Sequence, residues 1–200
     1  MIQRWLGNQL RQPKGLLSKL IGIYMQRGND SINRWTTDLL EIKKDDVLLE
    51  VGIGNGTTLN RIVANTKIEK IFGLDLSDEM IKQAKKLNKK YIEDGIVVLQ
   101  KGNIISLPYK DSIFDKVFSV HTLYFWTDIN QGVSEVHRVL KPGGKFCLSI
   151  TDKSQMEKME RTKNFNLINI EEIEKLLSNH MFHTIKLHQK GVYWCLEATK

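Results

Sequence analysis

The residues best suited to chemistry lie in one glycine-rich stretch, residues 50–56. An apolar run typical of a buried strand precedes this stretch, and apolar residues with helical spacing follow it. Glycine lets a ligand approach the backbone closely, and the first N–H groups of a helix are unpaired and attract anions. The stretch therefore predicts a nucleotide or another anionic ligand at a strand–turn–helix junction.

The spacing of the glycines narrows the choice of nucleotide. Gly52, Gly54 and Gly56 follow the pattern G-x-G-x-G, whereas a dinucleotide-binding turn reads G-x-G-x-x-G and needs its third glycine where Thr57 stands. Glu50 precedes the first glycine, and a fixed carboxylate is a poor neighbour for a pyrophosphate. It is a suitable neighbour for an ammonium group. The turn thus indicates a cofactor that ends in an amino acid.

Polar residues also follow the next two predicted strands. A carboxylate at Asp75 can accept hydrogen bonds from both hydroxyls of a ribose; its alternative role is to cap the following helix, for which Ser77 is already well placed. The carbonyl oxygen of Asn103 can accept from an adenine amino group, unless Gly102 and Asn103 form only an ordinary turn. Open α/β sheets bind ligands at the carboxyl ends of their strands, which favours the binding roles.

Strands and helices alternate through the middle of the chain. Strands are predicted at residues 47–51, 70–75, 96–100, 114–120 and 145–150, with helices at 57–65, from 77 onward and at 129–140. This alternation predicts an α/β fold with a mostly parallel, doubly wound, Rossmann-like sheet. A short helix at 170–177 and apolar runs at 184–189 and 192–199 then indicate a hairpin, so the sheet should end in an antiparallel strand.

The 200 residues predict one domain in three parts: an N-terminal helical cap at 1–44, a cofactor-binding core at 45–150 and a C-terminal helix and hairpin at 151–200. Within the cap, Pro13 marks a helix start and residues 28–31 mark a break before a second helix, capped by Asp30 or Ser31. A lysine-rich stretch, residues 82–90, is expected to expose its lysines and bury an opposite face that includes Leu87.

Composition limits the class of protein without selecting a partner. The formal net charge of +7 permits nucleic-acid, acidic-metabolite or membrane-surface partners. No apolar run approaches the roughly 20 residues of a membrane span, and the N-terminus lacks the layout of a signal peptide. Cys147 and Cys195 lie in strand-like runs and are expected to be buried thiols, which fits a reducing cytoplasm. No residues have metal-ligand spacing.

As a set, these motifs resemble the class I S-adenosylmethionine-dependent methyltransferases. The resemblance covers residues 45–150 and rests on the glycine turn, Asp75 with Leu76 and Ser77, the Gly-Asn turn, residues 114–117 and the Lys-Pro-Gly-Gly turn at 141–144. It is strongest to the small-molecule type similar to the ubiquinone and menaquinone biosynthesis enzymes. It implies a seven-stranded sheet with an antiparallel last strand, which agrees with the hairpin.

The resemblance implies S-adenosyl-L-methionine as cofactor and assigns its contacts. The methionine part lies against Glu50 and the glycines Gly52, Gly54 and Gly56, and Asp75 holds the ribose. The remaining cofactor residues are Leu76, Met80, Asn103 and Ile104 towards the adenine, and Val120 and His121 towards the transferred methyl group. Asn103 stands where the family usually has Asp, but it keeps an acceptor oxygen.

Residues after the fourth strand suggest how the acceptor is handled. His121 is the candidate catalytic residue as a general base, or it only lines the cofactor pocket. The aromatic run 121–126, with Tyr124 and Trp126, suits an apolar or planar substrate, or it packs against the following helix. Tyr24 is a further candidate substrate residue, and by analogy with the family Tyr24 and Met25 cover the cofactor.

The predicted function is direct in-line transfer of a methyl group to a small molecule. The alternatives are an RNA methyltransferase, motivated by the basic N-terminal segment, an NAD-dependent oxidoreductase, which the glycine spacing disfavours, and a non-catalytic nucleotide-binding module.

Overall fold

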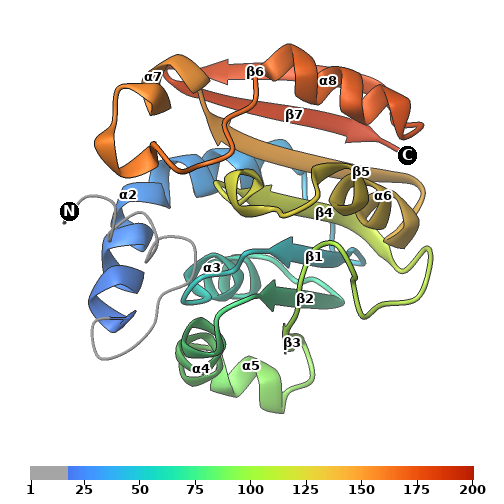
Figure 1. Ribbon diagram of the computed structural model, residues 1–200. Helices are drawn as coiled ribbons and strands as arrows, with labels where there is room; N and C mark the ends of the chain where they lie inside the picture. Colours follow the sequence, from blue (N-terminus) through green and yellow to red (C-terminus); the bar gives the residue numbers. More distant parts are fainter. Residues whose placement is uncertain (1–17) are drawn as a thin grey trace.

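The computed structural model describes residues 18–200, which form a seven-stranded sheet with the order β3-β2-β1-β4-β5-β7-β6 (Figure 1). Strands β1 to β5 are parallel, and β7 is antiparallel to both β5 and β6. The bounds are Val47–Val51 (β1), Lys70–Asp75 (β2), Val97–Lys101 (β3), Phe114–Val120 (β4), Leu140–Thr151 (β5), His183–Lys190 (β6) and Tyr193–Thr199 (β7). The predicted doubly wound sheet with an antiparallel C-terminal strand is confirmed.

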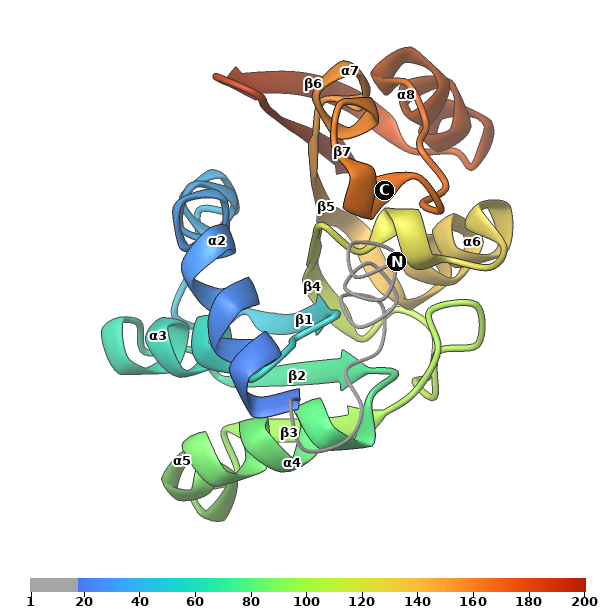
Figure 2. The ribbon, with the colours of Figure 1, turned by 60° about the vertical axis from the view of Figure 1, so that its left-hand side comes forward.

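Helices cover both faces of this sheet, as Figure 2 shows for α2 and α3 on one side and α6 and α8 on the other. The α-helices are Ser18–Leu39 (α2), Thr57–Asn65 (α3), Asp78–Leu87 (α4), Lys89–Glu93 (α5), Ile129–Val139 (α6), Lys153–Glu157 (α7) and Ile170–Asn179 (α8), with 3₁₀ turns at Leu123–Phe125 (η1) and Glu160–Thr162 (η2). Each face has its own apolar core. Burial on both faces explains why the first three residues of β1, Val47, Leu48 and Leu49, are all apolar.

Helix α2 is uninterrupted, so the predicted break at residues 28–31 is wrong. Asp30 does not cap a new helix but accepts a hydrogen bond of 2.8 Å from Nε of Arg34, one turn further on. Ile32 is fully buried against the sheet, and this packing outweighs the turn-forming preference of the preceding residues. The helix start predicted at Pro13 lies outside the described residues.

Two smaller predictions also need correction. Strand β5 begins at Leu140 rather than 145, because Gly143 and Gly144 pair with the backbone of Lys200. Leu87 is 46% exposed rather than buried, because α4 ends there and the next residue, Asn88, turns inward to donate to the carbonyl oxygens of Gly56 and Ala84. The cysteines Cys147 and Cys195 are buried and free, as predicted.

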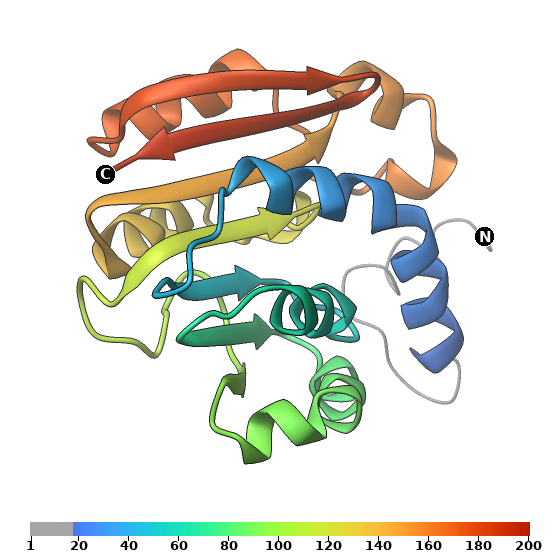
Figure 3. The same ribbon diagram turned by 180° about the vertical axis from the view of Figure 1, so that it is seen from behind.

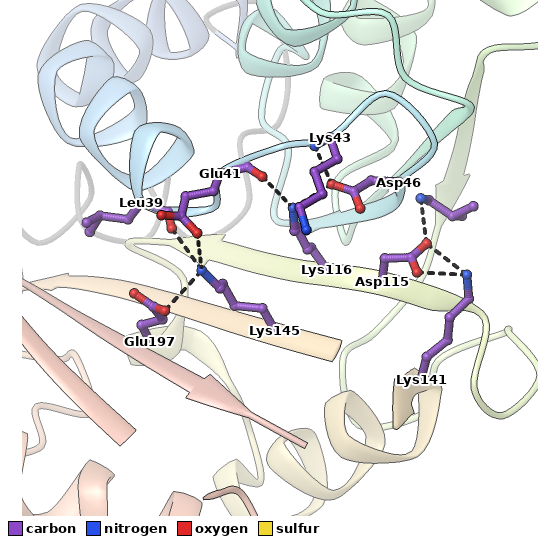
Figure 4. A network of polar contacts seen from close by, with 10 residues as sticks. Leu39, Glu41, Lys43, Asp46, Asp115, Lys116, Lys141, Lys145 and Glu197 are labelled. Atoms are coloured by element: carbon purple, nitrogen blue, oxygen red, sulfur yellow. Dashed lines mark hydrogen bonds and ion pairs between the residues drawn. The ribbon is translucent and has the colours of Figure 1, made fainter. Parts of the chain in front are cut away.

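A polar network fixes the end of α2 at the amino edge of the sheet (Figure 4). Nζ of the buried Lys116 donates to Asp46 Oδ2 at 2.5 Å and to the carbonyl oxygen of Glu41 at 2.7 Å. Nζ of Lys145 donates to the carbonyl oxygen of Leu39, the last residue of α2. Since α2 runs from the carboxyl edge of the sheet to this network (Figure 3), its other end is held over the carboxyl edge.

Gly56 provides a test of how α3 packs on α4. It has a φ of 78°, and a Cβ there would lie 2.7 Å from Ala84 Cβ and 3.0 Å from Ala84 Cα. We expect Gly56→Ala to lower the free energy of unfolding by more than Gly95→Ala, a matched control with a φ of 73° and no atom within 4 Å of the added Cβ. Backbone strain alone contributes about 1–3 kcal/mol at either position.

Urea unfolding of the two variants measures the difference between them. Equal losses of stability would show that the contact with Ala84 contributes nothing.

Candidate functional site

A cavity of about 1090 Å³, including the part open to solvent, lies at the carboxyl ends of β1, β2 and β4. From β1 the chain adds β2 and β3 on one side of the sheet and then β4 and β5 on the other side. Open α/β sheets bind ligands at the point where the order of the strands changes direction in this way. Ten of the predicted cofactor residues line it: Glu50, Gly52, Gly54, Asp75, Leu76, Met80, Asn103, Ile104, Val120 and His121. The sheet topology thus brings together residues that are far apart in sequence.

Glu50, at the end of β1, is 3% exposed, and its Oε2 atom is buried with no hydrogen-bond partner among the described residues. Burial raises the pKa of this carboxyl well above its usual range; nearby Arg61 opposes that shift and Asp75 adds to it. A buried polar atom without a partner calls for a ligand or a water. The atom therefore marks a place where a hydrogen-bond donor on a ligand would be stabilised.

Arg61, from α3, brings the opposite charge to the same end of the cavity. Its Nη1 atom lies 3.1 Å from Asp30 Oδ1, while Nη2 is buried without a hydrogen-bond partner in the described part of the chain. Burial lowers the pKa of Arg61, and the neighbouring Arg34 lowers it further. Together, Glu50 and Arg61 present one unpaired acceptor and one unpaired donor. A ligand with an adjacent ammonium and carboxylate would satisfy both.

Asp75 fixes the glycine turn against β2. Its Oδ2 accepts from Gly54 N at 2.9 Å and its Oδ1 accepts from Ser77 N at 2.8 Å. Burial raises the pKa of Asp75 to about 6, against the opposing effect of these backbone N–H groups. Ser77 caps α4 by accepting from Met80 N, so Asp75 is not needed as that cap. Leu76 N–H also bonds to Asp75, and because a carboxylate offers about four acceptor sites, Asp75 can still accept a further hydrogen bond.

The three glycines of the turn have different environments. At Gly52 a Cβ would lie 2.2 Å from Thr122 Cγ2, whereas at Gly54 it would meet nothing within 4 Å and would point into open space. Gly56 was predicted to contact the cofactor, but it does not line the cavity, and a Cβ there would meet α4 instead. The third glycine therefore allows α3 and α4 to pack closely.

The far end of the cavity is apolar. Met80 is fully buried there, beside Leu76 and Ile104. Asn103 Oδ1 accepts from Ile105 N at 3.3 Å, so Asn103 does shape its own turn, and its oxygen keeps one free lone pair. Trp126 also lines this cavity and donates from Nε1 to Thr122 Oγ1 at 3.0 Å.

His121 joins α2 to β5 through its ring. Its Nδ1 lies 3.0 Å from Asn29 Oδ1 and its Nε2 lies 2.9 Å from Thr151 Oγ1. Because an amide oxygen only accepts, Nδ1 carries the proton and Nε2 accepts from the threonine hydroxyl. Burial lowers the pKa of His121 to about 4. The ring is therefore neutral at pH 7, and both of its nitrogens are already bonded.

A second cavity, of about 820 Å³ including open solvent, adjoins the first and shares Asn29, His121 and Phe125 with it. Two of the predicted substrate residues, Tyr24 and Tyr124, line this cavity, whereas Trp126 lines only the first. Tyr24 is 51% exposed at its rim. The structure thus separates the predicted substrate residues between the two cavities.

Several lining residues were missed by the sequence analysis. Asn29, Asp30 and Asn33 lie on one face of α2 and line the first cavity. Their spacing is helical, but the segment was interpreted as a break. The second cavity adds Met156, Met159, Arg161, Phe165 and Tyr193 from the C-terminal part. No local motif marks these residues, because only the tertiary fold brings them to the site.

Residues 18–200 contain neither a metal-binding cluster nor a membrane-spanning helix. Their His, Cys, Asp and Glu residues include no group of three or more that could hold a metal ion. None of the described helices is long and apolar enough to cross a membrane.

Comparison with known proteins identifies relatives over most of the chain. A family model described as a methyltransferase domain matches residues 49–148. The putative methyltransferase YrhH of Bacillus subtilis is 35% identical over 85% of this chain and 87% of its own, and the uncharacterised methyltransferase YdaC of the same organism is 33% identical over 73% and 78%.

More distant matches extend the comparison to other enzymes and to solved structures. The sterol 24-C-methyltransferase ERG6 of Saccharomyces cerevisiae is 30% identical over 61% of this chain and 32% of its own. Among solved structures, the complex of the Haloferax volcanii Trm112 activator with its putative methyltransferase superposes with a TM-score of 0.78 over 97% of this chain and 96% of that one, at 16% identity. This last likeness concerns the fold alone.

Asp75 gives a pH test of the cavity. We expect the affinity for S-adenosylhomocysteine to fall as the pH drops through about 6, because protonation removes the acceptor that ribose hydroxyls need. Asp75→Asn should bind about tenfold more weakly at pH 7.5 through loss of a charge-assisted hydrogen bond.

Titration calorimetry between pH 5 and 8 measures both effects. Any pH dependence that the variant retains comes from groups other than Asp75. An identical pH dependence in parent and variant would contradict the assignment of Asp75.

Proposed function

The chain belongs to the class I S-adenosylmethionine-dependent methyltransferases, and we propose that it transfers a methyl group to a small molecule bound in the second cavity. The observation that carries this proposal is the pair of adjoining cavities, one with unpaired charged atoms and one with aromatic walls. Membership of this family removes the alternative of an NAD-dependent oxidoreductase. The finer resemblance to ubiquinone and menaquinone biosynthesis enzymes stays a prediction.

The lining of the first cavity fits S-adenosylmethionine from end to end. The unpaired Oε2 of Glu50 would accept from the α-ammonium group, and the unpaired Nη2 of Arg61 would donate to the α-carboxylate. Asp75 would accept from the ribose hydroxyls. We assign the adenine to the apolar end, formed by Leu76, Met80, Ile104 and the side-chain oxygen of Asn103.

Catalysis then rests on placement. The bound cofactor supplies a methyl group that its sulfonium already activates. The chain holds the acceptor beside it, and such orientation accounts for on the order of 7–11 kcal/mol of barrier reduction. Phe125 and His121 line both cavities where the two cavities meet. These side chains therefore determine the direction from which the acceptor approaches the methyl group.

We assign His121 a positioning role in place of general base. A ring with a pKa of about 4 is only a weak base at neutral pH, and its Nε2 atom already accepts a hydrogen bond from Thr151. The ring instead holds Asn29 of α2 against Thr151 of β5. An acceptor that loses a proton therefore releases it to water.

The chemistry of the second cavity favours a small molecule over RNA. Aromatic rings and thioethers form much of its lining, as in pockets for apolar small ligands. Among the described residues that line it, one cation is present, Arg161, whereas a phosphate backbone is bound through many. The relatives named for sterols and for 2-methyl-6-phytyl-1,4-hydroquinone carry names of apolar small-molecule substrates, which supports the same choice.

The direct test is S-adenosylhomocysteine release from S-adenosylmethionine, measured across small-molecule acceptors and total RNA. We expect release with small acceptors in the parent and its loss in Asp75→Ala, which removes the assigned ribose acceptor. Methyl transfer to RNA alone, with a rate that falls steeply with salt, would overturn the proposal.

The role of His121 is tested with His121→Asn. His121 has a φ of 56°, a conformation that Asn tolerates better than most residues. We expect kcat to fall by less than about tenfold with the pH profile between 6 and 8 unchanged, because no base is lost. A general base would account for roughly 10²–10⁴-fold and would remove an inflection from the profile.

A further inference from the structure

Among the described residues that line the second cavity, Arg161 is the one charged side chain. It lies in η2, partly buried, and no described carboxylate lies within ion-pair distance of it. Most other arginines of the described chain have such partners; Arg138, for example, pairs with Glu135 and Asp111. An unpaired guanidinium at a cavity wall is a binding group for a carboxylate, sulfonate or phosphate, which it can hold through two parallel hydrogen bonds.

Aromatic rings form much of the rest of the wall. Tyr124 and Phe165 stack with centroids 5.9 Å apart and planes at 22°, and Phe125 meets Phe165 edge-on at 4.7 Å. Met156 and Met159 add flexible thioether surface, which adapts to irregular apolar shapes. Flat ring faces and thioethers favour a planar, apolar body.

The polar groups of this wall are largely occupied within the protein. The hydroxyl of Tyr124 accepts from Thr151 N at 2.7 Å and donates to the carbonyl oxygen of the same residue. Both ring nitrogens of His121 are bonded, and no Asp or Glu within residues 18–200 lines the cavity. A cationic acceptor would therefore find no counter-charge, whereas an anionic one would find Arg161.

We propose that the second cavity binds a ring-sized apolar molecule with an anionic group, and that Arg161 determines this specificity by binding the anion. That the bound molecule is the methyl acceptor rests on the function proposed above; the anion site itself does not. Because both ring nitrogens of His121 are already hydrogen-bonded and no described Asp or Glu lines the cavity, an acceptor that is already ionised also suits the chemistry.

A matched pair of fluorescent probes tests the anion site directly. 1-Anilinonaphthalene-8-sulfonate and N-phenyl-1-naphthylamine share one aromatic body, but only the first carries a sulfonate. With the first cavity saturated by S-adenosylhomocysteine, we expect the sulfonate probe to bind about tenfold or more tightly than the neutral one.

Variants of Arg161 show whether this side chain is responsible. Arg161→Gln should remove the preference for the sulfonate while leaving the affinity for the neutral probe and for S-adenosylhomocysteine unchanged. Arg161→Lys should keep part of the preference for the sulfonate probe, because lysine keeps the positive charge but cannot form two parallel hydrogen bonds to the anion. Lys158→Gln is the matched control, since Lys158 is exposed on the same segment and does not line the cavity.

The outcomes separate the two proposals. If Arg161→Gln binds the sulfonate probe like the parent, or if Lys158→Gln loses the preference equally, the anion site is wrong. If the probe preference depends on Arg161 but no small molecule accepts a methyl group, the anion site stands and the proposed function fails. Unchanged thermal unfolding of both Gln variants shows that the losses are local.

Discussion

Glu50 places a carboxylate inside the protein at the end of the central strand, with one oxygen unpaired, and the arrangement of the site follows from this. An ionised carboxylate in such a position costs several kcal/mol of solvation unless a partner compensates. Arg61 from α3 supplies an opposite charge nearby but keeps one nitrogen unpaired. The protein thus holds an incomplete charge pair that a zwitterionic ligand completes.

Helix α2 is part of the same arrangement. Asp30 contacts Arg61 only because the helix continues through Gly28. The adjacent residue of the same helix, Asn29, contacts His121. At the other end, Lys145 ties the helix to the edge of the sheet. In the last turn of the helix, the hydroxyl oxygen of Thr36 lies 2.6 Å from that of Ser149. One anchored helix therefore closes the cofactor cavity and forms part of the wall of its neighbour.

The sequence predicts those parts of the site that directly follow a strand. Glu50, the glycine turn and Asp75 follow strands that periodicity identifies, and parallel pairing brings their ends together. Arg61 and Arg161 have no such signal, because their roles depend on which side of a helix or turn faces a cavity.

The errors have physical causes of the same kind. Residues 28–31 favour a turn in isolation, but the burial of Ile32 and the pairing of Asp30 keep them helical. Gly56 belongs to the glycine pattern, yet its missing side chain makes room for Ala84 and not for a ligand. Tertiary packing decides both cases, and a single sequence does not display it.

Recognition of the amino-acid part of the cofactor by the buried end of β1 is measured by titration calorimetry with two ligands. S-Adenosylhomocysteine and 5′-methylthioadenosine differ in that part alone. We expect the parent to bind the former far more tightly, and Glu50→Gln to narrow this difference in affinity about tenfold without changing the affinity for 5′-methylthioadenosine. An unchanged difference in Glu50→Gln would contradict this recognition.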